Sequence, residues 1–156
     1  MPSISNFRTQ VIDVTLTHSA DTFSAGDVIA ATQAVVLGPT TRPARGTINN
    51  IIAIDCNSTG KKFDIVFLDG NASIGTEGSA ASLSVSDSTK VLTVVDTGAS
   101  WVSLGNANIA QVTPFAPIPY NSSNSTIYIG AIARESTTHA YADYLKLRFF
   151  ISIENS

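Results

Sequence analysis

Apolar residues alternate with polar ones along most of this chain, and this period of two constrains the fold more than any other feature. The pattern is clearest near the end, where the alternating apolar residues are Leu145, Leu147, Phe149, Ile151 and Ile153. Such alternation is typical of β-strands with one buried face, whereas the 3.6-residue period of helices is almost absent. The sequence therefore predicts an all-β chain.

Further strands are predicted at residues 10–17, 27–37, 46–56, 62–69 and 127–134. The second of these is irregular enough to indicate one bulge, and the fourth is apolar on both faces, which predicts a central or covered strand. Turn residues at 57–60 predict a hairpin connection, and Ser86 is placed to cap a short helical turn over 86–92. Eight to ten strands in all predict a two-sheet antiparallel β-sandwich of jelly-roll type.

The 156 residues suit one domain, which we expect over residues 10–156. Residues 1–9 contain few large apolar groups and are expected to form an extended N-terminal arm. The opening residues lack the apolar core of a signal peptide, and no apolar run is long enough to span a membrane. We therefore expect a protein that is not secreted by a signal peptide and does not contact a membrane.

Charged residues make up 13% of the chain, against roughly 25% in an ordinary soluble domain. The net charge is −3 and the pI is about 5.1, which argues against a surface that binds nucleic acid directly. The single cysteine has no partner for an internal disulfide. Stability is therefore expected to come from apolar packing.

Residues that could carry catalysis are few and isolated. His18 and His139 have no metal-ligand partner nearby in sequence and are expected in loops or on the surface, while Cys56 is expected in the core. The loop from Asp69 to Glu77 holds two carboxylates among other oxygen donors, but ordinary turn chemistry explains it better than a calcium site. We therefore expect no enzyme activity, no cofactor and no bound metal, with Asp69 and Glu77 the only weak metal candidates.

No charged side chain occurs between Ser100 and Ala133. A monomer with many strands would normally carry charges along such a length, because they protect exposed strand edges from association. We therefore expect this region to be buried in a homo-oligomer, with a trimer favoured. The residues expected at the interface are Trp101, Phe115, Ile118, Tyr120 and Tyr128.

The aromatic residues also allow a different interpretation. Exposed tyrosine and tryptophan rings could form a platform for sugars, as in carbohydrate-binding modules. The candidates for such a platform are Trp101, Tyr120, Tyr128, Tyr141 and Tyr144. They are spread over several predicted elements, so packing or subunit contact is the favoured interpretation.

Several strings of the sequence resemble a widespread group of small virion structural proteins of tailed bacteriophages. They are GDVIAATQ at 26–33, FDIVFLDGNASIGTEGSA at 63–80, the Ser-Asp pair at 86–87, VSLG at 102–105 and IYIGAIAREST at 127–137. The resemblance spans roughly residues 11–153 and carries no catalytic residue.

This resemblance, with the size of the chain, implies a capsid decoration or cement protein. Such a protein would be made in the host cytoplasm, sit on the outside of an icosahedral head and bind the major capsid protein or other virion proteins. The N-terminal arm, through Phe7 and Arg8, is then the expected contact with the shell. A neck, tail or fibre module of the virion remains an alternative, and a carbohydrate-binding module is a less favoured one.

Overall fold

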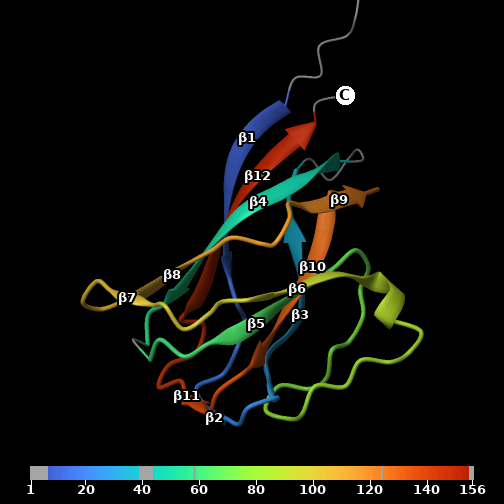
Figure 1. Ribbon diagram of the computed structural model, residues 1–156. Helices are drawn as coiled ribbons and strands as arrows, with labels where there is room; N and C mark the ends of the chain where they lie inside the picture. Colours follow the sequence, from blue (N-terminus) through green and yellow to red (C-terminus); the bar gives the residue numbers. More distant parts are fainter. Residues whose placement is uncertain (1–6, 39–43, 58, 124, 155–156) are drawn as a thin grey trace, which may run out of the picture.

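The computed structural model describes residues 7–38, 44–57, 59–123 and 125–154, and these form β-strands joined by loops (Figure 1). None of the helices in these ranges is long and apolar enough to cross a bilayer. The elements in chain order are β1 (Phe7–Thr15), β2 (Thr22–Phe23), β3 (Val28–Val36), β4 (Ala44–Asp55), β5 (Phe63–Leu68), the 3₁₀ turn η1 (Ser88–Lys90), β6 (Val91–Asp96), β7 (Val102–Ser103), β8 (Asn108–Val112), β9 (Ile118–Ser122), β10 (Thr126–Ala133), β11 (Thr137–Thr138) and β12 (Leu145–Glu154).

Two antiparallel sheets make up the sandwich. The first has the order β1-β12-β4-β8-β7, with β9 also paired to β4, and the second has the order β3-β10-β5-β6. Leaving out the two-residue strands β2, β7 and β11, and counting β8 and β9 as one interrupted strand because both pair with β4, the chain changes sheet at every step except from β5 to β6. This order is that of a jelly roll, which confirms the predicted fold class. The short pair β2–β11 lies at one end of the sandwich, and the end of β12 lies at the other (Figure 1).

The core fills the space between the sheets with the buried members of the alternating patterns. Phe67 of β5 and Phe149 of β12 meet across this space, with ring centroids 5.5 Å apart. The alternation of β12 is borne out, since its five predicted apolar residues are all buried. All six residues of β5 are buried, as its two apolar faces predict.

The second face of β5 is covered by the long segment that joins it to β6. Ala72 and Ile74 of this segment pack on Val66, Leu68 and Ile132. Gly130 of β10 makes the close approach possible, because a Cβ at that position would collide with the Ile74 side chain. We call residues 72–82 the covering segment.

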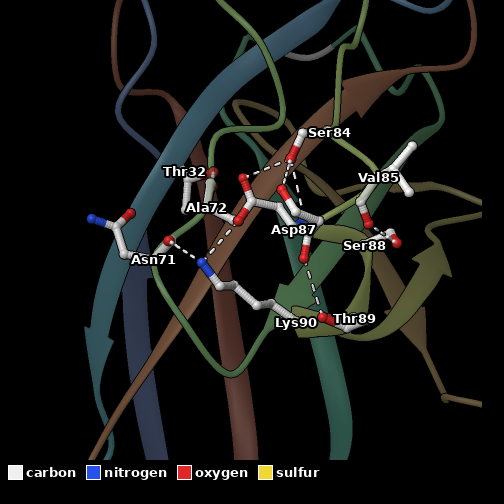
Figure 2. Close-up of polar contacts among 10 residues, drawn as sticks. Thr32, Asn71, Ala72, Ser84, Val85, Asp87, Ser88, Thr89 and Lys90 are labelled. Atoms are coloured by element: carbon white, nitrogen blue, oxygen red, sulfur yellow. Dashed lines mark hydrogen bonds and ion pairs between the residues drawn. The ribbon is translucent and has the colours of Figure 1, made fainter.

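Polar contacts fix the covering segment and the turn that follows it (Figure 2). The Thr32 hydroxyl donates to the Ala72 carbonyl at 2.6 Å, and the Lys90 ammonium donates to the carbonyl of Asn71 at 3.2 Å. The Asp87 carboxylate accepts from Lys90 and from the Ser84 hydroxyl, and these two contacts lower the pKa of Asp87. The helical turn predicted at 86–92 is thus a shorter one over 88–90, and Asp87 rather than Ser86 stands at its start.

The hairpin predicted at 57–60 is wrong. Strand β4 pairs with β12 on one side and with β8 and β9 on the other, so no edge remains for β5, and the connection crosses to the other sheet. The Asp55 carboxylate organises this crossover by accepting the backbone N–H groups of Asn57 and Gly60, at 2.8 and 3.0 Å. Turn-forming residues do follow β4 in the sequence, but the two strands that they join, β4 and β5, lie in different sheets and do not pair.

The start of β1 and the register of β3 also differ from expectation. Strand β1 begins at Phe7 and pairs with β12 from Phe7 opposite Glu154, so residues 7–9 belong to the sheet rather than to an arm. Residues 1–6 lie outside the described part of the chain. Strand β3 carries two register irregularities against β10, where the sequence predicts one bulge.

Candidate functional site

The first part of the uncharged region, residues 101–122, contains β7, β8 and β9 and lies along one side of the first sheet, whereas its last part forms β10 inside the second sheet. Strands β8 and β9 pair with successive parts of β4, and residues 113–117 leave the sheet between them (Figure 1). Pro114 and Pro117 account for this break, because proline has no N–H to donate to the ladder. The loop and β9 face β6 across a groove of about 410 Å³, lined by residues 92–96 and 113–119.

Large apolar side chains are exposed along this side. Phe115 is fully exposed, and Leu104, Val102 and Val94 are exposed to 70%, 61% and 49%. Strand β6 is the last strand of its sheet in the described structure, so one of its edges has no neighbouring strand. Val94 and Phe115 line the groove, whereas Val102 and Leu104 lie on and directly after β7. We call these four residues, together with the groove beside β6, the edge surface. Exposed apolar side chains beside a groove are typical of protein interaction sites.

The five residues predicted for an oligomer interface do not lie together on this surface. Ile118 and Tyr120 are only 2% and 3% exposed and belong to the core of the sandwich itself. Trp101 packs beside Phe63 and donates its Nε1–H to the Gly98 carbonyl, while Tyr128 is half-buried against the cluster beneath the covering segment. Phe115 is the member that stands free on the surface.

Sequence reasoning could not separate these residues, because it shows alternation without showing which face is covered. It also missed Val94, which lies outside the uncharged stretch but shares the groove with Phe115. Two features of β6 could have indicated it. Every second residue of the strand is apolar, and the strand carries too few charges to protect an exposed sheet edge.

The weak metal candidates occupy separate places. Asp69 follows β5 and lines a groove of about 500 Å³ near the end of β12, together with the Arg45–Glu154 ion pair. Glu77 instead accepts the backbone N–H of Ser19 at 2.6 Å. Within the described residues, no group of three or more His, Cys, Asp or Glu side chains is arranged to hold a metal ion.

Tyr120 lines the same groove as Asp69. Its hydroxyl is buried without a hydrogen-bond partner among the described residues, and burial raises the pKa of Tyr120. Gly46 leaves room for it, because a Cβ at Gly46 would lie 2.7 Å from the Tyr120 hydroxyl.

Of the two residues predicted to contact a capsid, Arg8 is exposed on β1 opposite Ile153, and Phe7 is the first residue of that strand.

A buried polar cluster lies at the opposite end, near β2 and β11. His18 and His139 are in loops, as expected, but each is only 3% exposed, so a surface position is wrong for both. Their ring centroids are 5.0 Å apart. The Asn57 amide lies 3.1 Å from Nδ1 of His139, and the Nε2 of His139 has no partner among the described residues.

Hydrogen bonds to backbone groups determine which ring nitrogen of His18 carries the proton. Its Nε2 accepts the N–H groups of Tyr144 and Leu145, at 3.0 and 3.2 Å, so this nitrogen carries no proton. Its Nδ1 therefore carries the proton and donates it to the Ser19 carbonyl at 2.9 Å. Both ring nitrogens of His18 are thus committed to backbone groups. A structural role in holding the start of β12 follows.

Cys56 is not a core residue. It follows the last residue of β4, is partly exposed, and donates its backbone N–H to the Tyr144 carbonyl at 3.1 Å. The expectation of a core position came from extending the alternation of β4 by one residue. The strand ends at Asp55, whose carboxylate turns the chain.

Comparisons with known proteins give matches to solved structures at low sequence identity. No protein-family model matches the chain, and no curated protein matches it. A chain from the structure of Cocksfoot mottle virus aligns over 100% of this chain and 87% of its own length, with 12% identity and a TM-score of 0.38. A chain of Desmodium yellow mottle tymovirus aligns over 99% and 84%, with 13% identity and a TM-score of 0.38.

A third solved structure, that of Turnip yellow mosaic virus, aligns over 100% of this chain and 86% of its own, with 7% identity and a TM-score of 0.33. Identities and TM-scores this low carry no argument about function. The jelly-roll assignment therefore rests on the strand order of this chain.

Proposed function

We propose that this chain is a structural protein of a virus particle, and specifically a decoration or cement protein on the outside of a tailed-bacteriophage head. The observation that carries the proposal is the edge surface, where Phe115 is fully exposed and belongs to the stretch from Ser100 to Ala133, which contains no charged residue. The resemblance of several sequence strings to tailed-phage virion proteins points the same way. The jelly roll by itself selects no function, because this fold serves many.

The proposed mechanism is binding without catalysis. A subunit that buries apolar edge surface against copies of itself forms a rigid oligomer, for which we favour a trimer. Each subunit then adds one contact to the capsid, and linked contacts bind far more tightly than single ones. Attachment at several points would oppose the outward pressure of packaged DNA.

The contact with the capsid is assigned to the start of the chain. Arg8 is exposed at the beginning of β1, next to the end of β12, and residues 1–6 precede it outside the described structure. The edge surface lies along β6 to β9 and is thus made of other residues. A subunit with these two regions could bind its own copies and a shell at the same time.

The self-association is tested by replacing Phe115 with serine. We expect the purified chain to sediment as an oligomer and Phe115→Ser to shift it toward monomer, with a dissociation constant weaker by about tenfold or more, as for residues central to interfaces. Val85→Ser is the matched control, since Val85 is 90% exposed but lies outside the edge surface. A wild-type chain that remains monomeric at high concentration would contradict the proposal.

A neck, tail or fibre module is the second candidate, because such parts are also β-rich and oligomeric. Copy number separates the two. A decoration protein is present in hundreds of copies per particle and appears as regularly repeated density on the head, whereas a tail part is present in a handful. Quantitative mass spectrometry of purified particles, together with a particle reconstruction, decides between them.

A further inference from the structure

A solvent-filled hollow of about 600 Å³ lies near the end of the sandwich where β12 begins. It is lined by Cys56, Asn106, Tyr141, Asp143, Tyr144 and Lys146. The rings of Tyr141 and Tyr144 stack with centroids 5.0 Å apart and planes inclined by 25°. Tyr141 is 59% exposed and Tyr144 is 38% exposed, so the aromatic pair faces the solvent.

The buried polar cluster beneath holds the backbone of this pair in place. The Tyr144 N–H donates to Nε2 of His18 at 3.0 Å, and the Tyr141 N–H donates to the side-chain oxygen of Asn57 at 3.2 Å. Between them, Asp143 has a φ of +57° and accepts the His18 N–H at 3.0 Å. A non-glycine residue in this left-handed conformation persists only where its surroundings fix it, so the pair is preorganised.

The walls of the hollow combine apolar faces with few but varied polar groups. Tyrosine rings offer flat apolar faces, Asp143 accepts hydrogen bonds, Lys146 donates them, and the Asn106 amide does both. The volume lies in the range of small-ligand sites, which are characteristically lined by aromatic groups with a few polar ones. A sugar ring has the matching chemistry, since its C–H groups form an apolar face and its hydroxyls both donate and accept.

We propose that this hollow is a saccharide-binding site, in which a sugar ring lies against Tyr141 and its hydroxyls bond to Asn106, Asp143 and Lys146. The hollow is lined by one acidic and one basic side chain, Asp143 and Lys146, and this balance of charge favours a neutral polar ligand over a phosphate or another anion. The polar walls distinguish the hollow from the edge surface, which has no charge in its 100–133 portion and suits protein contact. The inference uses none of the four edge-surface residues and is independent of the proposed function.

The structure also reduces the number of aromatic residues that could form the sugar platform considered in the sequence analysis. Trp101 packs beside Phe63 with its Nε1–H bonded, Tyr120 is buried, and Tyr128 is half-buried. Of the five aromatic candidates, Tyr141 and Tyr144 are the two that are exposed and adjacent.

The test is an array of oligosaccharides built from hexoses, N-acetylhexosamines, deoxyhexoses and uronic acids, probed with the full-length chain. We expect binding to a subset of them. For the best ligand, calorimetric titration should show binding weakened by about tenfold or more in Tyr141→Ala, because the stacking face is lost. Tyr141→Phe keeps the ring and should bind within a few-fold of wild type.

Two controls keep the test decisive. Phe115→Ala removes an exposed aromatic ring elsewhere and should leave saccharide binding unchanged, and thermal unfolding of each variant establishes that it is folded. An array with no saccharide bound by the folded chain overturns the proposal, as does undiminished binding by Tyr141→Ala. A Tyr141→Ala variant that loses self-association while no saccharide binds would assign the pair to a protein contact and also overturn it.

Discussion

His18 and His139 show which properties of a single residue the sequence predicts and which it does not. Turn-forming neighbours correctly predict loops for both, but each ring contacts groups far away in the chain: His18 accepts the backbone N–H groups of Tyr144 and Leu145, and His139 lies against the Asn57 amide. The same holds for Tyr120, whose aromatic side chain suits an interface as well as a core. Composition around a residue indicates its local structure, whereas its burial is decided by segments that the local sequence does not contain.

Burial of His139 makes stability depend on pH. Burial lowers the pKa of His139 below its ordinary value of 6.5, His18 lowers it further, and Asp55 partly opposes the shift. The unfolded chain therefore binds a proton at a higher pH than the folded chain does. Stability should fall as the pH drops through 6.5 toward the lowered pKa of the folded protein.

This dependence is measured by denaturant unfolding of the wild type and His139→Asn between about pH 7.5 and pH 5.5. The asparagine amide oxygen lies close to the position of the histidine Nδ1, so it keeps an acceptor for the Asn57 amide. Because asparagine does not titrate, the free energy of unfolding of the variant should change less over this range. Equal pH slopes for the two proteins would show that His139 does not take up the proton.

At the scale of elements, period-two alternation is sufficient to find the main strands but not to pair them. The predicted ranges for β1, β3, β4, β5, β10 and β12 agree with the structure to within a few residues, because alternation is a local property. The hairpin predicted at 57–60 fails because pairing is decided by which strand edges remain free. The apolar second face of β5 did predict a cover, but only the structure identifies residues 72–82 as that cover.

The covering segment should therefore contribute measurably to stability. Ile74 is 2% exposed and lies over Gly130, so Ile74→Ala leaves a cavity and is expected to lower the free energy of unfolding by about 2–5 kcal/mol. Val85→Ala, at a 90% exposed position close by in sequence, should change it by less than about 0.5 kcal/mol. Similar values for the two variants in chemical denaturation would mean that the segment does not seal the sheet.

For the molecule as a whole, the positions of the charged residues say more about association than the net charge does. A net charge of −3 gives weak repulsion between copies, but the ion pairs all lie outside residues 100–133, for example Arg148–Asp13 and Arg134–Asp64. The sequence predicts this uneven distribution directly, since it requires only counting. Which apolar side chains it leaves exposed could not be predicted, because Ile118 and Phe115 belong to the same uncharged stretch and differ only in packing.

Association through such a surface should respond to salt in a characteristic way. Contacts between apolar groups are not screened by ions, whereas the repulsion between copies of net charge −3 is. Raising NaCl from about 0.05 M to about 0.5 M should therefore leave the dissociation constant of the oligomer unchanged or make it tighter, as followed by sedimentation equilibrium. An interface made of ion pairs would weaken over the same range, and such weakening would move the oligomer contact from the edge surface to the charged strands β1 and β12, where Arg148 and Asp13 lie exposed.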